Sequence, residues 1–268
     1  MKINIIGCGS IGTKLATALC EMEDIELIYI SDKKKEKASD LLKLSTRVRF
    51  QREPKGVMEK VDMVIEAASQ DAARIYVPMA LEKGKDVLMM SVGALVDDEF
   101  RAKCRLTAKK NGCRVYIPSG AVAGIDGLSA AACGNIEEVL LISYKPPEAF
   151  KGVRYLEERQ IDLDSIQRAT IIFEGHAKDA VRYFPRNINV AATVSLAGIG
   201  FEKTRVRLVA DPSARMNTHR IIVKGDIGEI EVSCRNLPSP LNPKSSLLAA
   251  LSAISTVKKA KENVWVGA

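Results

Sequence analysis

Three glycines near the start of the chain have the spacing of a dinucleotide-binding turn. Gly7, Gly9 and Gly12 follow a short β-branched run and open an apolar helical pattern, with Ser10 and Ile11 between the last two. In such a turn the first glycine allows a sharp exit from the strand and the second lets a pyrophosphate approach the backbone. The third lets the helix pack close to the strand, and the helix start offers free N–H groups to the phosphates.

Asp32 occupies the position where this motif requires an acid. It lies 20 residues after Gly12, behind a second apolar run from Leu27 to Ile30, and can accept hydrogen bonds from the adenosine ribose. A glycine turn alone could serve the fold and bind nothing, but the strand before it and the acid after it favour nucleotide binding. Because a carboxylate here repels a 2′-phosphate, we predict NAD as the preferred cofactor and NADP as a usable second choice, helped by the lysines at 33–35.

Small residues follow two later apolar runs. Ala67 and Ala68 in EAASQ leave room for a cofactor, so we assign them to its binding site. The stretch 91–94 (SVGA) follows the next run and is expected to line the nicotinamide cleft. Asn189, in FPRNINVAATVSLAG, can either cap a helix or hold the nicotinamide amide, which needs a donor and an acceptor together.

His219 is the sharpest candidate for proton transfer. It stands at the start of a predicted strand in DPSARMNTHRIIV, where Asn217 shares its face and Ile221 continues that face inwards. A histidine titrates near neutral pH, which suits a base beside a hydride acceptor. The alternative is a histidine satisfied on a sheet edge. His176 precedes a helical pattern and is more simply a cap or a surface residue.

Strand and helix signals alternate over the first 120 residues and predict a doubly wound, mostly parallel Rossmann sheet. The pattern changes near Pro118, where PSGAVAGIDG is rich in small residues. Residues 121–240 then predict an α+β substrate domain with a mixed or antiparallel sheet, including a hairpin at 225–228. A last helix within residues 241–268 is expected to pack back on the first domain.

Composition excludes several classes of protein. The 268 residues are 47% hydrophobic and 27% charged, and no apolar run approaches the roughly 18 residues that a membrane span needs. The net charge of +7 could indicate a nucleic-acid partner, but the lysines are spread over helical surfaces, so we predict no nucleic acid and no membrane. Six cysteines without a CxxC pair are typical of small core residues in a reducing cytoplasm, and with two histidines we predict no metal site.

Seven stretches give the chain a resemblance to the L-aspartate dehydrogenase family. They lie between residue 3 and about residue 254 and read IGCGSIG, EAASQ, SVGAL, IPSGAVAGIDG, FPRNINVAATVSLAG, ADPSARMNTHRI and NLPSPLNPKSSLLAALSAI. The resemblance implies an NAD(P)-dependent enzyme that oxidises L-aspartate to iminoaspartate, which feeds quinolinate and NAD synthesis or hydrolyses to oxaloacetate and ammonia. It places the family's active-site histidine on His219 and its cofactor contacts on Asn189 and Ala123, the latter through the backbone amide. A quinolinate-forming partner enzyme and a cytoplasmic homodimer complete these expectations.

Three alternatives remain at this point. One is another dehydrogenase of similar architecture, such as a homoserine dehydrogenase or a dihydrodipicolinate reductase, although the chain lacks the paired histidines of that reductase. Another is a non-catalytic NAD-binding sensor, but the presence of His219 and Asn189, the predicted catalytic and cofactor residues, makes this alternative less favourable. The role of His219 as a base or as a carboxylate binder also stays open. Arginines are the expected partners of the substrate carboxylates, with Arg168, Arg186 and Arg220 as the candidates.

Overall fold

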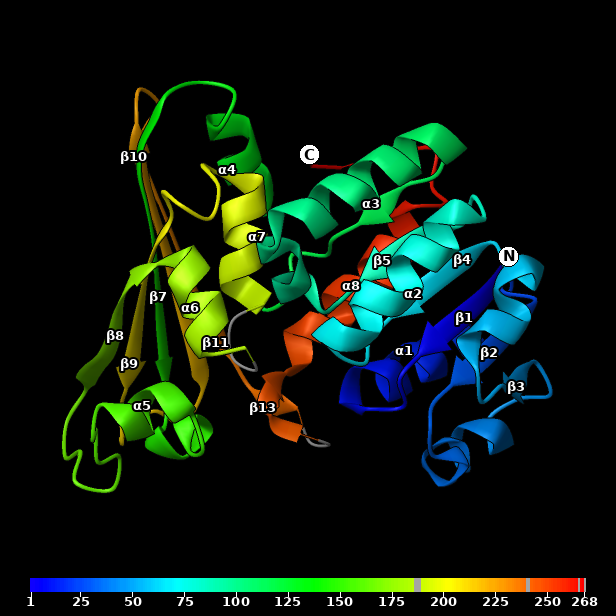
Figure 1. Ribbon diagram of the computed structural model, residues 1–268, viewed down its shortest axis with the longest axis horizontal. Helices are drawn as coiled ribbons and strands as arrows, with labels where there is room; N and C mark the ends of the chain where they lie inside the picture. Colours follow the sequence, from blue (N-terminus) through cyan, green and yellow to red (C-terminus); the bar gives the residue numbers. More distant parts are fainter. Residues whose placement is uncertain (186–188, 240–241, 265, 268) are drawn as a thin grey trace. The chain divides into compact units, whose positions relative to one another are not determined.

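The computed structural model describes residues 1–185, 189–239, 242–264 and 266–267 (Figure 1). The chain forms two compact units. One consists of residues Met1–Pro118 with Ala250–Glu262, and the other of Ser119–Ala249 with Asn263–Ala268. Each unit has its own sheet, and each is described by itself below.

A six-stranded sheet with the order β3-β2-β1-β4-β5-β6 forms the centre of the first unit. All of its neighbouring strands are parallel. The strands are β1 (Lys2–Ile6), β2 (Leu27–Ser31), β3 (Val48–Phe50), β4 (Met63–Glu66), β5 (Asp86–Met89) and β6 (Val115–Tyr116). This order confirms the predicted doubly wound Rossmann sheet, with its switch point between β1 and β4.

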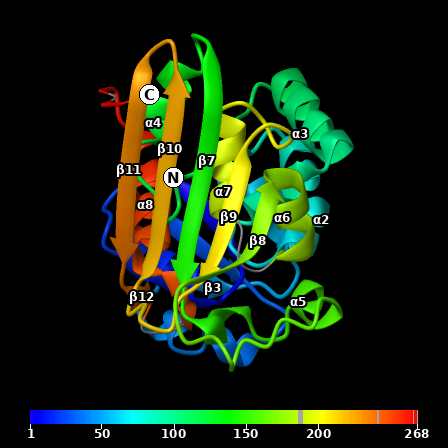
Figure 2. The same ribbon diagram turned by 90° about the vertical axis from the view of Figure 1, so that its left-hand side faces the viewer.

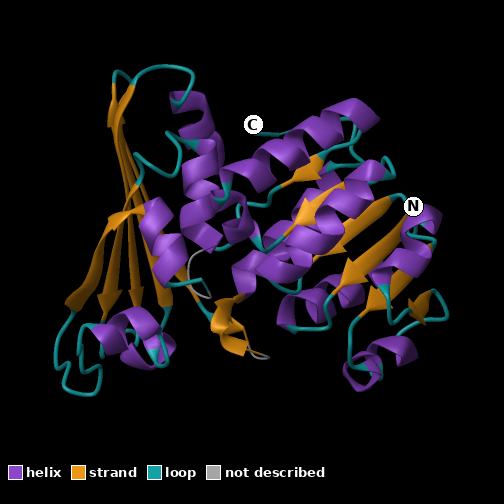
Figure 3. Cartoon of the chain, in the orientation of Figure 1, coloured by secondary structure: helices purple, strands orange, loops and turns teal. Residues whose placement is uncertain are grey.

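Helices follow the strands of this sheet as the sequence predicts, and the alternation can be followed in Figure 3. They are α1 (Ser10–Cys20), α2 (Gln70–Glu82) and α3 (Asp98–Asn111), with short 3-10 turns η1 (Lys35–Ala38), η2 (Leu41–Lys43), η3 (Pro54–Lys60) and η4 (Val92–Val96). A further helix, α8 (Leu247–Lys259), follows no strand of this sheet, and its residues from Ala250 onward belong to this unit. Apolar spacing explains their packing: Leu15, Ala16 and Leu19 of α1 are fully buried. Ser69 caps α2 by accepting from the Ala72 N–H, and Gly112 ends α3 in the left-handed region.

The second unit contains a five-stranded sheet with the order β11-β10-β7-β9-β8. It is mixed, because β7 and β9 run parallel while the other neighbours are antiparallel. Its strands are β7 (Ile136–Lys145), β8 (Thr170–His176), β9 (Arg205–Ala210), β10 (Asn217–Gly225) and β11 (Gly228–Asn236), and a separate small hairpin joins β12 (Pro238–Ser239) to β13 (Asn242–Ser246).

Helices lie on one face of this second sheet, as Figure 1 shows for α4 (Ile125–Ala131), α6 (Ala177–Tyr183) and α7 (Asn189–Ala197). Figure 2 shows the opposite face, over which the described part of the chain places no helix. The remaining elements are α5 (Arg154–Glu158) and η5 (Pro147–Phe150). The hairpin predicted at 225–228 is confirmed, since Gly225 pairs with Gly228 at the end of the β10–β11 ladder.

Some local expectations need correction. The strand β8 is missing from the sequence prediction, although the start of Thr170–His176 (TIIF) has the β-branched and aromatic residues typical of a strand. All six cysteines are free, but Cys133 is exposed and is not a core residue.

No helix in the described residues is long and apolar enough to span a membrane. The same residues contain no group of three side chains arranged to bind a metal ion.

Candidate functional site

The glycine turn after β1 has a geometry that only glycine can supply at two of its positions. Gly7 has a φ of +105°, which an L side chain rarely adopts. A Cβ on Gly12 would lie 1.9 Å from the carbonyl oxygen of Gly7, so the start of α1 approaches the turn too closely for any side chain. A Cβ on Gly9 would meet nothing within 4 Å, which leaves open space beside that backbone.

Asp32 follows β2 directly and holds this turn from the side. Its Oδ2 accepts a hydrogen bond from the Cys8 N–H at 2.9 Å, and its Oδ1 accepts one from the Lys34 N–H at 3.0 Å. A carboxylate oxygen can accept a second hydrogen bond, so both remain able to receive ribose hydroxyls. Asp32 therefore has a structural role in the turn in addition to its predicted role toward a nucleotide.

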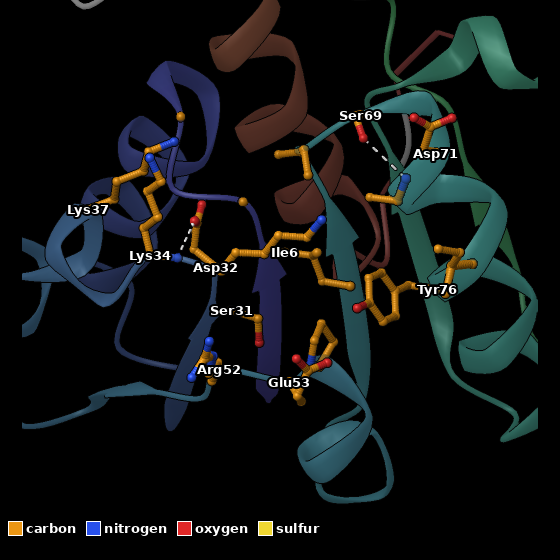
Figure 4. A pocket seen from close by; sticks show the side chains of 18 residues that line it. Ile6, Ser31, Asp32, Lys34, Lys37, Arg52, Glu53, Ser69, Asp71 and Tyr76 are labelled. Atoms are coloured by element: carbon orange, nitrogen blue, oxygen red, sulfur yellow. Dashed lines mark hydrogen bonds between the residues drawn. The ribbon is translucent and has the colours of Figure 1, made fainter.

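A pocket of about 520 Å³ lies over the carboxyl ends of β1, β2 and β4 in the first unit (Figure 4). This is a size usual for a small-molecule site, at the place where open parallel sheets bind ligands. Five predicted cofactor residues line it, namely Gly7, Gly9, Asp32, Ala67 and Ala68. The other three of the turn, Ser10, Ile11 and Gly12, lie in the first turn of α1 and do not line the pocket.

Cations surround Asp32 in this pocket. Lys34 and Lys37 lie on one side of it in Figure 4, and Arg52, just after β3, lies on the other side near Ser31. Arg52 and Lys37 were missing from the predicted site. The signal that could have found Arg52 is its place two residues past the third strand of the sheet, where the chain again reaches the carboxyl edge.

Glu66, the last residue of β4, is a fully buried carboxylate that organises two loops. Its Oε1 accepts hydrogen bonds from the N–H groups of Ala68 and Ser69 at 2.8 and 3.0 Å, and from Ser91 Oγ at 2.9 Å. Its Oε2 accepts from the Ser91 N–H at 3.0 Å. Burial raises the pKa of Glu66, against the lowering effect of these four donors. The carboxylate thereby fixes the Ala67–Ala68 backbone at the pocket wall.

A second group of polar side chains lies at one end of the buried face of the second sheet. His219 of β10 is opposite Ser143 of β7 in the ladder, and Ser143 Oγ lies 2.9 Å from His219 Nδ1. Asn217 and His219 are both buried and share their face with the buried Ile221 and Val223, as the alternation predicts. His219 is thus an interior residue at the end of an apolar face and not a residue on an exposed edge.

Lys145, the last residue of β7, is 6% exposed and lies two residues beyond Ser143 on this face. Burial lowers the pKa of Lys145 to about 8. Burial also lowers the pKa of His219 to about 3, and the positive charge of Lys145 adds to that effect. At neutral pH the cluster therefore holds an ammonium group beside a neutral imidazole. Lys145 is not among the site residues predicted from the sequence.

The segment around Ala123 reaches the same end of the sheet. Cys234 of β11 pairs with His219, and its Sγ accepts a hydrogen bond from the Ala123 N–H at 3.2 Å. Two residues further along β11, the Asn236 Nδ2 donates a hydrogen bond to the Ala121 carbonyl oxygen at 2.8 Å. Ala123, predicted to contact the cofactor through this amide, is exposed, and its N–H already has the cysteine as acceptor.

The remaining candidates lie elsewhere. Asn189 is exposed and is the first residue of α7, while His176 is the residue before α6 and makes no capping hydrogen bond with its side chain. Arg220 alternates with His219, so it points to the opposite face, where it pairs with Glu231 at 2.6 Å. Arg168 is exposed in the loop before β8. Arg186 lies outside the described residues.

Two family models cover most of the chain. One described as "Aspartate dehydrogenase, C-terminal" matches residues 126–260, and one described as "Homoserine dehydrogenase, NAD binding domain" matches residues 7–118. The first match covers the second sheet with His219 and Lys145, and the second covers the glycine turn and Asp32. A nicotinamide-dinucleotide-binding domain is therefore joined to the domain characteristic of aspartate dehydrogenases.

Similarity extends over the full length of known proteins. The chain is 47% identical to the L-aspartate dehydrogenase of Methanosarcina barkeri, covering 100% of this chain and 99% of the relative. The crystal structure of aspartate dehydrogenase from Thermotoga maritima matches with a TM-score of 0.77 and 30% identity, over 100% of this chain and 99% of that one. A hyperthermophilic archaeal homoserine dehydrogenase, at 15% identity and a TM-score of 0.61 over 97% of both chains, shares the fold. Because the family-specific domain and the full-length relatives agree, the chain belongs to the L-aspartate dehydrogenase family.

Proposed function

We propose that this protein oxidises L-aspartate to iminoaspartate with a nicotinamide dinucleotide, using NAD in preference to NADP. The observation that carries the proposal is the full-length similarity to L-aspartate dehydrogenases, at 47% identity to the Methanosarcina barkeri relative. Within the chain it is supported by a glycine turn with an acid at β2 in one unit and a buried histidine with a buried lysine in the other.

The residues of the first unit fit a dinucleotide. The open space beside Gly9 leaves the backbone accessible to a pyrophosphate, and the N–H groups at the start of α1 favour its charge. Asp32 keeps lone pairs for the ribose, and Ala67 and Ala68 present a small-residue wall to the pocket. When bound, the nicotinamide ring would accept a hydride from the substrate Cα. We assign Ser10, Ile11 and Gly12 to the turn itself, and Ala123 and Asn189 to cofactor contacts from the second unit's sequence.

His219 is proposed as the catalytic base. Its pKa of about 3 makes the imidazole neutral at physiological pH, so one ring nitrogen carries a lone pair that can take a proton. If Nδ1–H donates to Ser143 Oγ, the lone pair is on Nε2, and the serine fixes the orientation of the ring. The proton comes from the substrate amine as the C–H bond breaks, or from the water that adds to the imine. An anionic substrate beside the ring would stabilise the imidazolium that results.

A panel of substrates tests this function. NADH formation should be observed with L-aspartate at alkaline pH and should be far slower with L-glutamate, L-alanine and L-homoserine. Oxaloacetate with ammonia should consume NADH. Homoserine is the informative control, because the family model matched by residues 7–118 takes its name from homoserine dehydrogenase. No turnover of aspartate with either cofactor would refute the proposal.

The fate of the product follows from its chemistry. Iminoaspartate hydrolyses to oxaloacetate and ammonia in water, or is consumed by an enzyme that condenses it toward quinolinate and NAD. Such a partner enzyme, a homodimeric assembly and a cytoplasmic location remain predictions from the sequence. Size-exclusion chromatography with light scattering would test the homodimer directly.

A further inference from the structure

The buried Lys145 side chain carries an ammonium group that has no counterion in the part of the chain that the structure describes. Its residue is 6% exposed, and among the described residues the ammonium forms no ion pair and no hydrogen bond. Moving an ammonium group out of water is costly unless an anion or several acceptors replace the water. On the opposite face of the sheet, Arg220 and Arg207 each have a glutamate as counterion.

A second unsatisfied donor lies beside it. Asn217 is 4% exposed, and its Nδ2 has no hydrogen-bond partner among the described residues. The β7–β10 ladder ends at the pair Thr218–Tyr144, and Asn217 and Lys145 are the next residues of the two strands, both buried at the same end of the face. His219 lies two residues further along β10 on the same face, and its Nδ1 lies within hydrogen-bond distance of Ser143 Oγ. The end of this face therefore presents two donors that lack acceptors.

We propose that Lys145 and Asn217 form the subsite that binds a carboxylate of the substrate, with the ammonium and the amide as the two donors. A carboxylate oxygen would satisfy each of them and supply the missing counterion. This inference rests on the proposed function, because it assigns the acidic substrate to the residues beside the proposed base. It also replaces the arginines expected from the sequence, since Arg220 faces away from the site and Arg168 is exposed.

A role for Lys145 as the base itself fits the geometry less well. Near neutral pH the lysine is protonated and can only donate, whereas His219 is neutral and can accept. Burial lowers the pKa of His219, and the positive charge of Lys145 lowers it further. Burial first, and this positive charge in addition, keep the imidazole neutral until a carboxylate arrives. Binding of the acid thus weakens the effect of Lys145 on His219 and raises the basicity of the ring as the reaction begins.

Calorimetric binding of succinate, with NAD at saturation, tests the subsite without turnover. Lys145→Met keeps the length of the side chain and removes the charge, and it should weaken succinate binding by about 10- to 100-fold, the range for losing a hydrogen bond to a charged group. The KM for aspartate should rise by a similar factor, and the Kd for NAD should not change. Lys224→Met is the matched control, because Lys224 is on the same strand as His219 but is exposed and faces the other side.

Asn217→Asp is the second variant and keeps the shape of the side chain. It gives Lys145 a counterion within the protein, so the variant should fold at least as stably as wild type and still lose succinate binding. Wild-type succinate binding should weaken by up to tenfold per pH unit above about pH 8, and Lys145→Met should lose that dependence.

The outcomes separate the two proposals. If both variants bind succinate like wild type, the subsite is wrong even when aspartate is the substrate. A Lys145→Met enzyme with wild-type KM and collapsed kcat would overturn the subsite in favour of proton transfer by the lysine. If wild type turns over no aspartate but binds succinate through Lys145, the carboxylate site stands and the proposed reaction fails.

Discussion

A methyl group added at Gly12 should destabilise the folded protein before any cofactor binds. Its Cβ would be 1.9 Å from the Gly7 carbonyl oxygen, where ordinary contact begins at 3.4 Å, and 3.1 Å from the carbonyl carbon. Both neighbours are backbone atoms, so no rotamer change relieves the overlap, and the turn or the start of α1 must move by about 1.5 Å. Overpacking of this kind costs about 1–3 kcal/mol. Gly12→Ala should therefore lower Tm by about 2–12 °C, given about 2–4 °C per kcal/mol for a domain of this size.

Gly9→Ala is the matched control in the same turn. Its φ of −78° suits any residue, and its new Cβ would meet nothing within 4 Å, so its Tm without cofactor should stay within about 2 °C of wild type. Its NAD affinity should fall, because the methyl group occupies the space through which a pyrophosphate reaches the backbone. Thermal unfolding with and without NAD measures both effects. A Gly12→Ala protein as stable as wild type would refute the packing argument, and a Gly9→Ala protein with undiminished NAD affinity would refute the assignment of the turn.

Other positions give predictions with separate readouts. His219→Ala should lower kcat by about 10²-fold or more with little change in the Kd of NAD, and near-wild-type turnover would make His219 structural. Asp32→Ala should narrow or reverse the preference for NAD over NADP, measured as kcat/KM at fixed salt. The variant removes the carboxylate that repels a 2′-phosphate and leaves the positive charges of Lys34, Lys37 and Arg52. A wild type that prefers NADP several-fold would contradict our interpretation of Asp32. In Glu66→Gln the new NH2 group replaces one of two oxygens that both accept hydrogen bonds from backbone N–H groups, so one donor loses its acceptor. The variant should lower the free energy of unfolding by about 1–3 kcal/mol, measured by denaturant titration. Unchanged stability would show that the loops rearrange freely. Because the pKa of His219 is lowered in the folded state, wild type should lose stability as the pH falls from 6.5 toward 3: over that range the imidazole is protonated in the unfolded chain but not in the folded one. His219→Gln should lose less stability over the same range.

The first unit could be predicted in detail because its signals are local. Apolar runs, the glycine spacing and the acid after β2 are each contained in a short window, and they specify strand, turn, helix and strand in order. The strand order then follows from the right-handed crossovers of such folds. Arg52 was missed because the glycine and acid motif contains no position after β3, so the place of Arg52 two residues past that strand was the only available signal.

The second unit was predicted less completely because its sheet depends on non-local pairing. The hairpin between β10 and β11 has a local turn signal, whereas β7 lies between β9 and β10, which are far from it along the chain. The order of the strands along the chain does not indicate which strands are neighbours in a mixed sheet of this kind. The strand β8 was missed although its first four residues, TIIF, favour a strand, because it follows a charged aperiodic segment and passes directly into α6.

The candidate catalytic cluster shows where sequence reasoning reaches its limit. Alternation along β10 predicts that Asn217 and His219 share a face, but the residues across from them are 76 positions away in the chain. Only the β7–β10 register brings Ser143 to the imidazole and Lys145 to the same end of the face. A slip of that register by one residue would turn Lys145 and Ser143 to the opposite face, where Arg220 already has its glutamate. The buried apolar residues of the same face, Leu141 and Val139 on β7 against Ile221 and Val223 on β10, prevent the slip because it would expose them to water. The hydrophobic half of the sheet therefore sets the register that places an ammonium beside a neutral histidine.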